Sequence, residues 1–340
     1  GESWQKISPD LTTNDPKKQR QNESGGLTRD NSTAENHTTI FAISESPKNP
    51  QVVWAGTDDG NLQVTRDGGK TWTNVAANTG VPKGTWVSRV EASPHDEGTA
   101  FATFDGHMTG DMNTYVSKTT DFGKTWTSLA TGDTKGFAHV IKQDTVNPDL
   151  LFLGTETGLF LTIDGGKQWA QFTSGLPMVP VRDVAVHPRD HDLVLATHGR
   201  GLYVVDDITP LRALTPQILN SDFAFLPTRP GQLLIEGAGF GGAPWFGDHE
   251  FAGVSPEGGA PIVYYSKRRH VVGDFKFEVR DSAGKLLATI PASKRRGVNR
   301  IVWSTRDQAP RFAAGAGVIP SLGAFFGARA IAGKYSVTAL

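Results

Sequence analysis

An eight-residue motif that recurs three times constrains the fold of this chain more than any other feature of its sequence. The copies are TRDGGKTW at 65–72, TTDFGKTW at 119–126 and TIDGGKQW at 162–169. In each copy the aspartate can accept hydrogen bonds from N–H groups of its own turn, a following glycine can adopt a positive φ, and the tryptophan can cover the hairpin. We therefore interpret these residues as structural rather than catalytic: Asp67, Trp72, Asp121, Trp126, Asp164 and Trp169.

The spacing of the motif predicts an all-β fold made of propeller blades. Asp67 and Asp121 are 54 positions apart, Asp121 and Asp164 are 43 apart, and 43 more reach Asp207 in a degenerate copy. A blade of four short strands takes about 40 to 50 residues. The expected strands are 39–43, 52–55, 62–65, 71–75, 87–92, 99–103, 115–118, 125–129, 138–141, 150–153, 159–162 and 168–172.

The ring of blades is expected to be incomplete within this chain. The last period holds only three strand-like segments, at 181–186, 193–196 and 202–205, while residues 4–7 read as the outer strand of an earlier blade. Exposed strand edges favour association with other strands. We expect an upstream segment or another chain to supply the remaining blades, although closure of a four-bladed ring by residues 4–7 is the alternative.

A second domain is expected after the blades. Residues 1–210 read as β-propeller blades, residues 211–260 as a Gly- and Pro-rich connector, and residues 261–340 as a small β-sandwich. The strands expected in the sandwich are 261–266, 275–280, 286–290, 300–303 and 335–340. Short strands with polar turns of this kind favour an immunoglobulin-like or fibronectin-like sandwich.

Composition narrows the classes of function and partner. The 34 Lys and Arg nearly cancel the 35 Asp and Glu, without a long block of either sign, which argues against a nucleic-acid partner. The chain has no cysteine, and its histidines lack a recognisable ligand spacing, so we expect neither a metal site nor a cofactor. No apolar run approaches the roughly 20 residues of a transmembrane helix. Three glycosylation triplets, whose use the sequence leaves open, begin at Asn22, Asn31 and Asn36.

The three motifs, together with ATHGRGLYVVDDITPL at 196–211, resemble the large bacterial BNR-repeat (Asp-box) proteins labelled glycosyl hydrolase-like or sortilin-like. GVNRIVW at 297–303 and AGKYSV at 332–337 resemble the Ig-like module that ends those proteins. The resemblance implies a secreted, periplasmic or cell-surface protein. It does not decide the chemistry, since xyloglucanases, sialidases, sortilin-type receptors and photosystem assembly factors all use such blades.

Candidate site residues lie in loops between the second and third strands of each blade, at the rim opposite the motifs. Glycoside hydrolysis needs two carboxyl groups flanking the scissile bond, and Asp58, Asp105 and Glu156 are the candidates for catalysis. A ligand-binding face at the same rim would include Asp59, His107, Asp111, His198 and Arg200. Arg89, Arg182 and Arg200 are scattered over three blades and do not form a recognisable sialidase cluster.

The sequence is compatible with three functions. The first is a noncatalytic extracytoplasmic scaffold that binds protein or glycan within a larger chain or assembly. The second is the distal half of a glycoside hydrolase that uses paired carboxylates. The third is a sortilin-like receptor that binds peptides, which would need an apolar tunnel wall and an edge strand able to pair with the peptide.

Overall fold

A computed structural model describes residues 3–23, 27, 36–233, 258–308 and 327–340. The chain divides into two compact units, Gly1–Arg212 and Ala213–Leu340. Of the glycosylation triplets, Asn31 lies outside the described residues. Among the described helices, none has the length and apolar character needed to cross a membrane.

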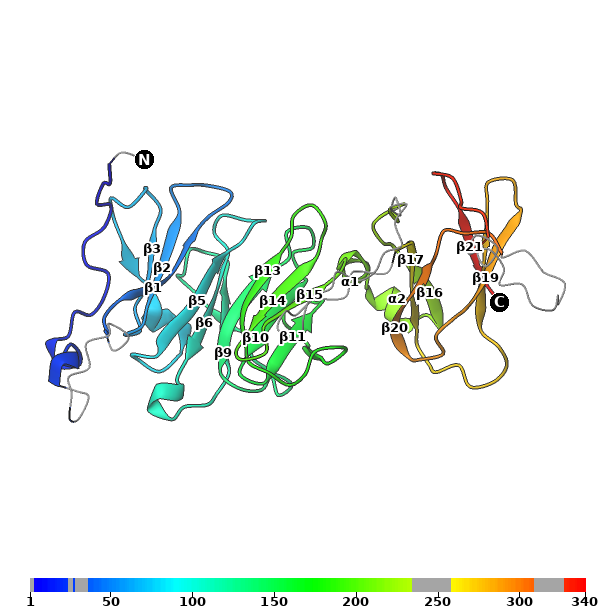
Figure 1. Ribbon diagram of the computed structural model, residues 1–340. Coiled ribbons are helices and arrows are strands. Elements are labelled where there is room, and N and C mark those ends of the chain that lie inside the picture. Colours follow the sequence, from blue (N-terminus) through cyan, green and yellow to red (C-terminus); the bar gives the residue numbers. More distant parts are fainter. Residues whose placement is uncertain (1–2, 24–26, 28–35, 234–257, 309–326) are drawn as a thin grey trace. The chain divides into compact units, whose positions relative to one another are not determined.

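The first unit contains four consecutive antiparallel sheets, each a meander of neighbouring strands (Figure 1). The first sheet contains β1 (Ile40–Glu45), β2 (Val53–Thr57), β3 (Leu62–Thr65) and β4 (Thr73–Asn74). The second contains β5 (Trp86–Ala92), β6 (Ala100–Asp105), β7 (Tyr115–Thr119) and β8 (Thr127–Ser128). The third contains β9 (Ala138–Gln143), β10 (Leu151–Thr155), β11 (Gly158–Thr162) and β12 (Ala170–Phe172). The fourth sheet has three strands: β13 (Val181–Val186), β14 (Leu193–Thr197) and β15 (Leu202–Val205). These sheets are propeller blades, as the repeat period predicts.

Apolar side chains hold neighbouring blades together face to face. β1 packs against β5, β5 against β9, and β9 against β13. Trp54 and Val87 belong to a cluster between the first two blades, whereas Phe152 and Val181 belong to one between the last two. Every residue of β10 is buried, as expected for a continuously apolar strand that is covered on both faces.

The repeated turn forms the predicted hydrogen bonds. Asp67 accepts from the N–H of Thr71 at 2.9 Å and from its hydroxyl at 2.6 Å. The hydroxyl of Thr65 donates to Asp67 and accepts from the N–H of Gly69, whose φ is 93°. The second and third copies repeat this arrangement around Asp121 and Asp164.

The N-terminal segment joins none of the described sheets. Residues 3–11 contain no strand, and the side chain of Trp4 is 99% exposed. The segment runs beside the first blade, where Asn61 and Gln63 donate their side-chain amides to the carbonyl of Leu11. Residues 4–7 do not pair with the fourth blade, so they do not close a four-bladed ring. The carbonyl of Ile7 accepts from Trp72 Nε1, as the carbonyl of Leu129 after the second blade accepts from Trp169 Nε1, and the place of residues 4–7 as the outer strand of an earlier blade stays a prediction. Short helices η1 (Pro16–Lys18), η2 (Gln21–Glu23), η3 (Ala76–Thr79) and η4 (His107–Thr109) lie in loops of this unit.

Within its described residues, the second unit contains two three-stranded sheets that share one aromatic core. One sheet has the order β16-β17-β20, and the other has the order β19-β18-β21. The strands are β16 (Phe223–Leu226), β17 (Ala260–Ser266), β18 (Lys276–Arg280), β19 (Leu286–Pro291), β20 (Gly297–Trp303) and β21 (Ser336–Ala339). Tyr264, Phe277 and Trp303 are buried between the sheets. The Ig-like topology stays a prediction.

The stretch expected to be a connector holds regular structure at its beginning. α1 (Thr209–Arg212) and α2 (Pro216–Asn220) precede β16, which pairs with β17. The sequence reasoning missed β16 because its four residues stand alone among polar and proline-containing segments. Residues 234–257 of the expected connector lie outside the described residues.

Candidate functional site

A β-bulge recurs near the start of the first strand in each blade. The strand register shifts between Ile40 and Ala42 in β1 and between Val87 and Arg89 in β5, and it shifts in the same way across residues 138–140 of β9 and 181–183 of β13. The extra residue of a bulge is unpaired, and its side chain is turned away from the regular alternation. The bulged residues are Phe41, Ser88, His139 and Arg182.

These four bulged residues line one cavity of about 310 Å³. The remaining lining residues come from the same first strands and from the end of β6: Trp86, Arg89, Asp105 and Asp183. The cavity therefore takes side chains from all four blades. It exists because each blade places a bulge at the equivalent point of its innermost strand.

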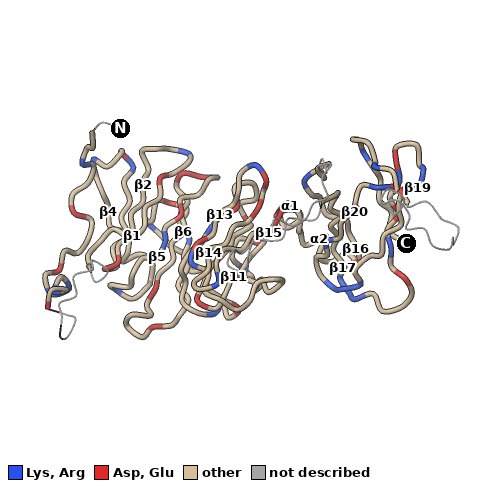
Figure 2. Tube along the Cα trace, in the orientation of Figure 1, with Lys and Arg blue, Asp and Glu red and all other residues tan. Residues whose placement is uncertain are grey.

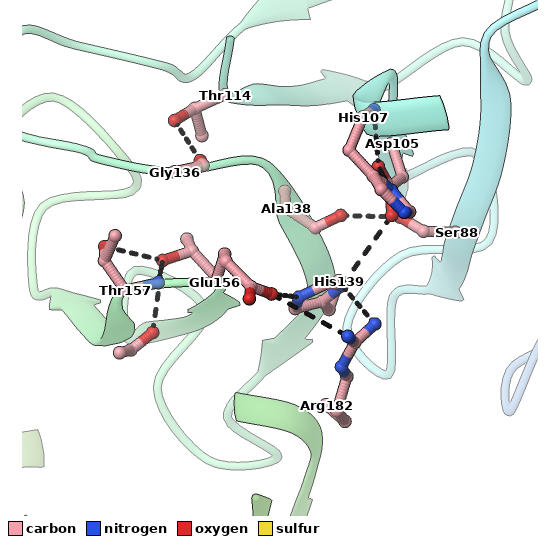
Figure 3. Close-up of polar contacts among 12 residues, drawn as sticks. Ser88, Asp105, His107, Thr114, Gly136, Ala138, His139, Glu156, Thr157 and Arg182 are labelled. Atoms are coloured by element: carbon pink, nitrogen blue, oxygen red, sulfur yellow. Dashed lines mark hydrogen bonds and ion pairs between the residues drawn. The ribbon is translucent and has the colours of Figure 1, made fainter. Parts of the chain in front are cut away.

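A chain of polar contacts runs through the wall of this cavity (Figure 3). Buried Asp105 accepts from the backbone N–H of His107 at 2.9 Å, and its Oδ1 lies 2.6 Å from the ring Nδ1 of His107. Its Oδ2 lies 3.9 Å from Nδ1 of His139. On the other side of that ring, Nε2 of His139 contacts Glu156 Oε2 at 3.0 Å. Arg182 approaches both His139 Nδ1, at 3.3 Å, and Glu156, at 3.7 Å.

The surroundings of His139 favour its neutral form. Burial is the largest influence and lowers the pKa of His139, while the hydrogen bond to Glu156 opposes the shift without cancelling it. A neutral ring protonated at Nε2 can donate to Glu156 and accept from Arg182 at Nδ1. Phe137 packs edge-on against this ring and stacks on His107. The histidine is thus fixed from several sides.

Two donors in the cavity wall have no acceptor among the residues that the structure describes. The indole Nε1 of Trp86 and the Nε of Arg89 are buried and make no hydrogen bond. The other end of the Arg89 guanidinium pairs with Asp183. Buried donors without partners are costly, because each has lost its hydrogen bond to water.

The structure brings three of the predicted site residues together and separates the others from them. Asp105, His107 and Glu156 meet around His139. Asp58 instead bonds Thr39 at 2.8 Å, and buried Asp59 holds the N-terminal segment through Thr13. The hydroxyl of Tyr115 donates to Asp111 and lowers the pKa of that carboxyl. His198 and Arg200 are exposed in the β14–β15 loop and do not line the cavity.

Asp105 and Glu156 do not flank an open groove. They contact opposite nitrogens of one imidazole, so His139 fills the space between them that a glycosidic bond would need. The side chain of Asp105 is only 1% exposed. The arrangement is suited to holding a histidine and an arginine in place at the cavity wall.

The sequence does not predict His139, Ser88, Trp86 or Asp183 as site residues, and it places Arg89 and Arg182 on different blades without bringing them together. Within strands of alternating pattern, such residues read as ordinary surface or core positions, since a bulge leaves no mark in that pattern. The sequence does hold one usable signal. When the first strands of the second, third and fourth blades are aligned, the second position of each is polar: Ser88, His139 and Arg182.

Comparisons with known proteins identify no family for this chain. No protein-family model and no curated protein matches it. Among solved structures, a GH74 enzyme from Niastella koreensis is 22% identical over 50% of this chain and 24% of its own, with a TM-score of 0.39. YCF48 bound to a D1 peptide is 19% identical over 49% of this chain and 51% of its own, with a TM-score of 0.37. YCF48 from Cyanidioschyzon merolae is 20% identical over 49% of this chain and 52% of its own, with a TM-score of 0.37.

The chain thus spans between a quarter and about half the length of these proteins. Likeness at this level carries no argument about activity. The assignment of propeller blades rests on the chain's own repeated four-stranded sheets.

Proposed function

We propose that the first unit is a noncatalytic binding module which recognises a protein or glycan, as part of a larger chain or assembly. The cavity formed by the bulged residues of the four blades is the observation that carries this proposal. The bulged side chain of each blade differs in chemistry from the other three: aromatic, hydroxyl, imidazole and guanidinium. Such a mixed wall suits recognition of a ligand by several weak contacts.

The chemistry of the wall favours a ligand that presents a carboxylate. The side chains of Arg182 and Arg89 belong to the cavity wall and are 42% and 35% exposed. Guanidinium groups bind carboxylates with good geometry. Phe41 packs edge-on against Trp86 at 4.5 Å and provides an apolar wall for a sugar ring or an aliphatic side chain.

The hydrolase alternative has less support. The carboxylates that line the cavity are Asp105, which is bonded to His107, and Asp183, which is paired with Arg89. Neither is positioned as an uncommitted partner for general acid or base work.

We place the module outside the cytoplasm on the strength of the BNR-repeat resemblance. We also expect further blades to cover the exposed Leu202 and Val204 of β15.

The test is binding to an array of peptides and oligosaccharides that contains acidic members and their neutral counterparts. The purified chain should retain members that carry a carboxylate, and Arg182→Gln should weaken this binding at least tenfold. Arg189→Gln is the matched control, because Arg189 is 82% exposed and lies outside the cavity. Equal retention of neutral and acidic members, unaffected by Arg182→Gln, would refute the proposal.

A further inference from the structure

Two basic loops of the second unit lie side by side. The β17–β18 loop covers 267–275, and the β19–β20 loop covers 292–296. The backbone N–H of His270 donates to the carbonyl of Lys294 at 3.0 Å, and Nζ of Lys294 donates to the carbonyl of Gly273 at 2.6 Å. These contacts join the two loops into one surface, which we call the basic loop pair.

The basic loop pair concentrates positive charge in a chain whose net charge is −1. It carries Lys267, Arg268, Arg269, Lys294, Arg295 and Arg296, with Asp274 as the acidic residue in the two loops. Figure 2 shows Lys and Arg segments gathered at this end of the unit, beside the label β17. The four arginines are exposed, and none of them forms an ion pair within the described part of the chain. Their charge is therefore available to an anionic partner.

The tip of the longer loop is apolar. Val271 and Val272 directly follow the basic run, and each is 78% exposed. A single exposed apolar residue needs no explanation, but two adjacent valines beside four exposed guanidinium groups combine the features of a peripheral membrane contact. Arginines bind lipid phosphates, while small apolar side chains enter the boundary between headgroups and acyl chains.

We propose that the basic loop pair docks the second unit onto an anionic lipid bilayer. Arg268, Arg269, Arg295 and Arg296 bind headgroup phosphates, and Val271 and Val272 enter the interface between them. A soluble polyanion would satisfy the arginines equally well but would leave both valines in water. The valines are therefore the reason for choosing a bilayer over nucleic acid or another polyanion.

The test is cosedimentation of the full chain with vesicles of phosphatidylcholine, with and without phosphatidylglycerol, at low and high salt. The chain should bind the anionic vesicles, and salt should weaken the binding because it screens the charges. Arg295→Gln with Arg296→Gln should lower vesicle affinity about 25-fold, since each basic residue near an anionic surface contributes about a fivefold factor. Val271→Ser with Val272→Ser should lower it several-fold at unchanged charge.

The matched control is Lys17→Gln with Lys18→Gln, which removes the same charge from an exposed helix of the first unit and should leave vesicle binding unchanged. No binding to anionic vesicles, or equal loss with the control variant, would overturn the proposal. Binding of a short DNA duplex tests the alternative that the basic loop pair binds nucleic acid or another polyanion. Binding to the duplex as tight as to vesicles, and insensitive to the valine substitutions, would show a general polyanion site and would also overturn it.

Discussion

At the scale of single residues, the three copies of the repeat motif differ in how deeply the tryptophan is buried. Trp169 is 6% exposed, and its Nε1 donates to the carbonyl of Leu129 in the preceding blade at 2.9 Å. Trp72 is only partly buried, and its Nε1 bonds the carbonyls of Gly69 and Ile7. Trp169→Ala should therefore lower the free energy of unfolding by about 3–5 kcal/mol, and Trp72→Ala should lower it clearly less. Urea denaturation of both variants checks this, and equal losses would contradict it.

The aspartates of the motif should make stability depend on acid pH. Hydrogen bonds from Thr71 lower the pKa of Asp67 to about 2, and hydrogen bonds from Thr125 lower the pKa of Asp121 to about 2. A carboxyl whose pKa is depressed on folding stabilises the fold above its ordinary pKa of 3.8, and this contribution disappears as the pH falls through about 2. Thermal unfolding should lose stability over that window. Asp67→Asn with Asp121→Asn should be less stable at neutral pH and show a shallower acid dependence; an unchanged acid slope would disprove the link.

Residue types alone could predict these turns but not the cavity wall. The turn chemistry is local, because Asp67 bonds partners within four positions. His139 acquires its role from Asp105, Glu156 and Arg182, which belong to three other strands or loops and are far from it in sequence. These side chains come together only because of the β-bulges and the order of the blades.

At the scale of elements, close approach between blades requires a glycine in β10. A Cβ on Gly154 would lie 2.5 Å from the carbonyl oxygen of Val181 and 2.7 Å from Val140 Cγ1. Because the first contact is to the backbone of the next blade, Gly154→Ala should force β10 and β13 apart and cost about 1–3 kcal/mol. Gly132→Ala, with no neighbour within 4 Å, is the control. Chemical denaturation measures both, and a neutral Gly154→Ala would show that the blades can separate at little cost.

A buried ion pair fastens α1 to the third blade. Nε and Nη2 of Arg212 donate to the two oxygens of Asp144 at 2.9 and 2.7 Å, and the side chain of Asp144 is fully buried. Arg212→Met leaves that carboxylate without its partner and should cost about 3–5 kcal/mol. Arg189→Met, which removes an exposed pair, should cost less than about 1 kcal/mol. Urea denaturation of the first unit checks both values, and similar costs would mean that Asp144 finds other partners.

The strands of the blades were predictable because each follows a repeat with its own turn signal. β13 even has the bounds expected from the sequence, 181–186. β16 was missed because it has no repeat to mark it. Strand pairing partners, unlike strand propensity, are decided by distant parts of the chain.

At the scale of the whole molecule, the two units present different surfaces. The first unit offers a cavity built at one point of the repeat, and the second offers a pair of basic loops. The net charge of −1 conceals this division, because the acidic and basic residues balance only over the full chain. Overall composition therefore indicates little about partners. The local grouping of charged side chains, in the cavity of the first unit and in the loops of the second, indicates anionic ligands for both.

We expect the cavity to bind its ligand without cleaving it. The most direct measurement is release of reducing ends from a panel of neutral and acidic polysaccharides by the wild-type chain and by Asp105→Asn with Glu156→Gln. We predict no release above background by either protein, while wild-type binding to carboxylate-bearing ligands remains measurable. Release by the wild type that disappears in the double variant would contradict the account and would establish these carboxylates as catalytic residues.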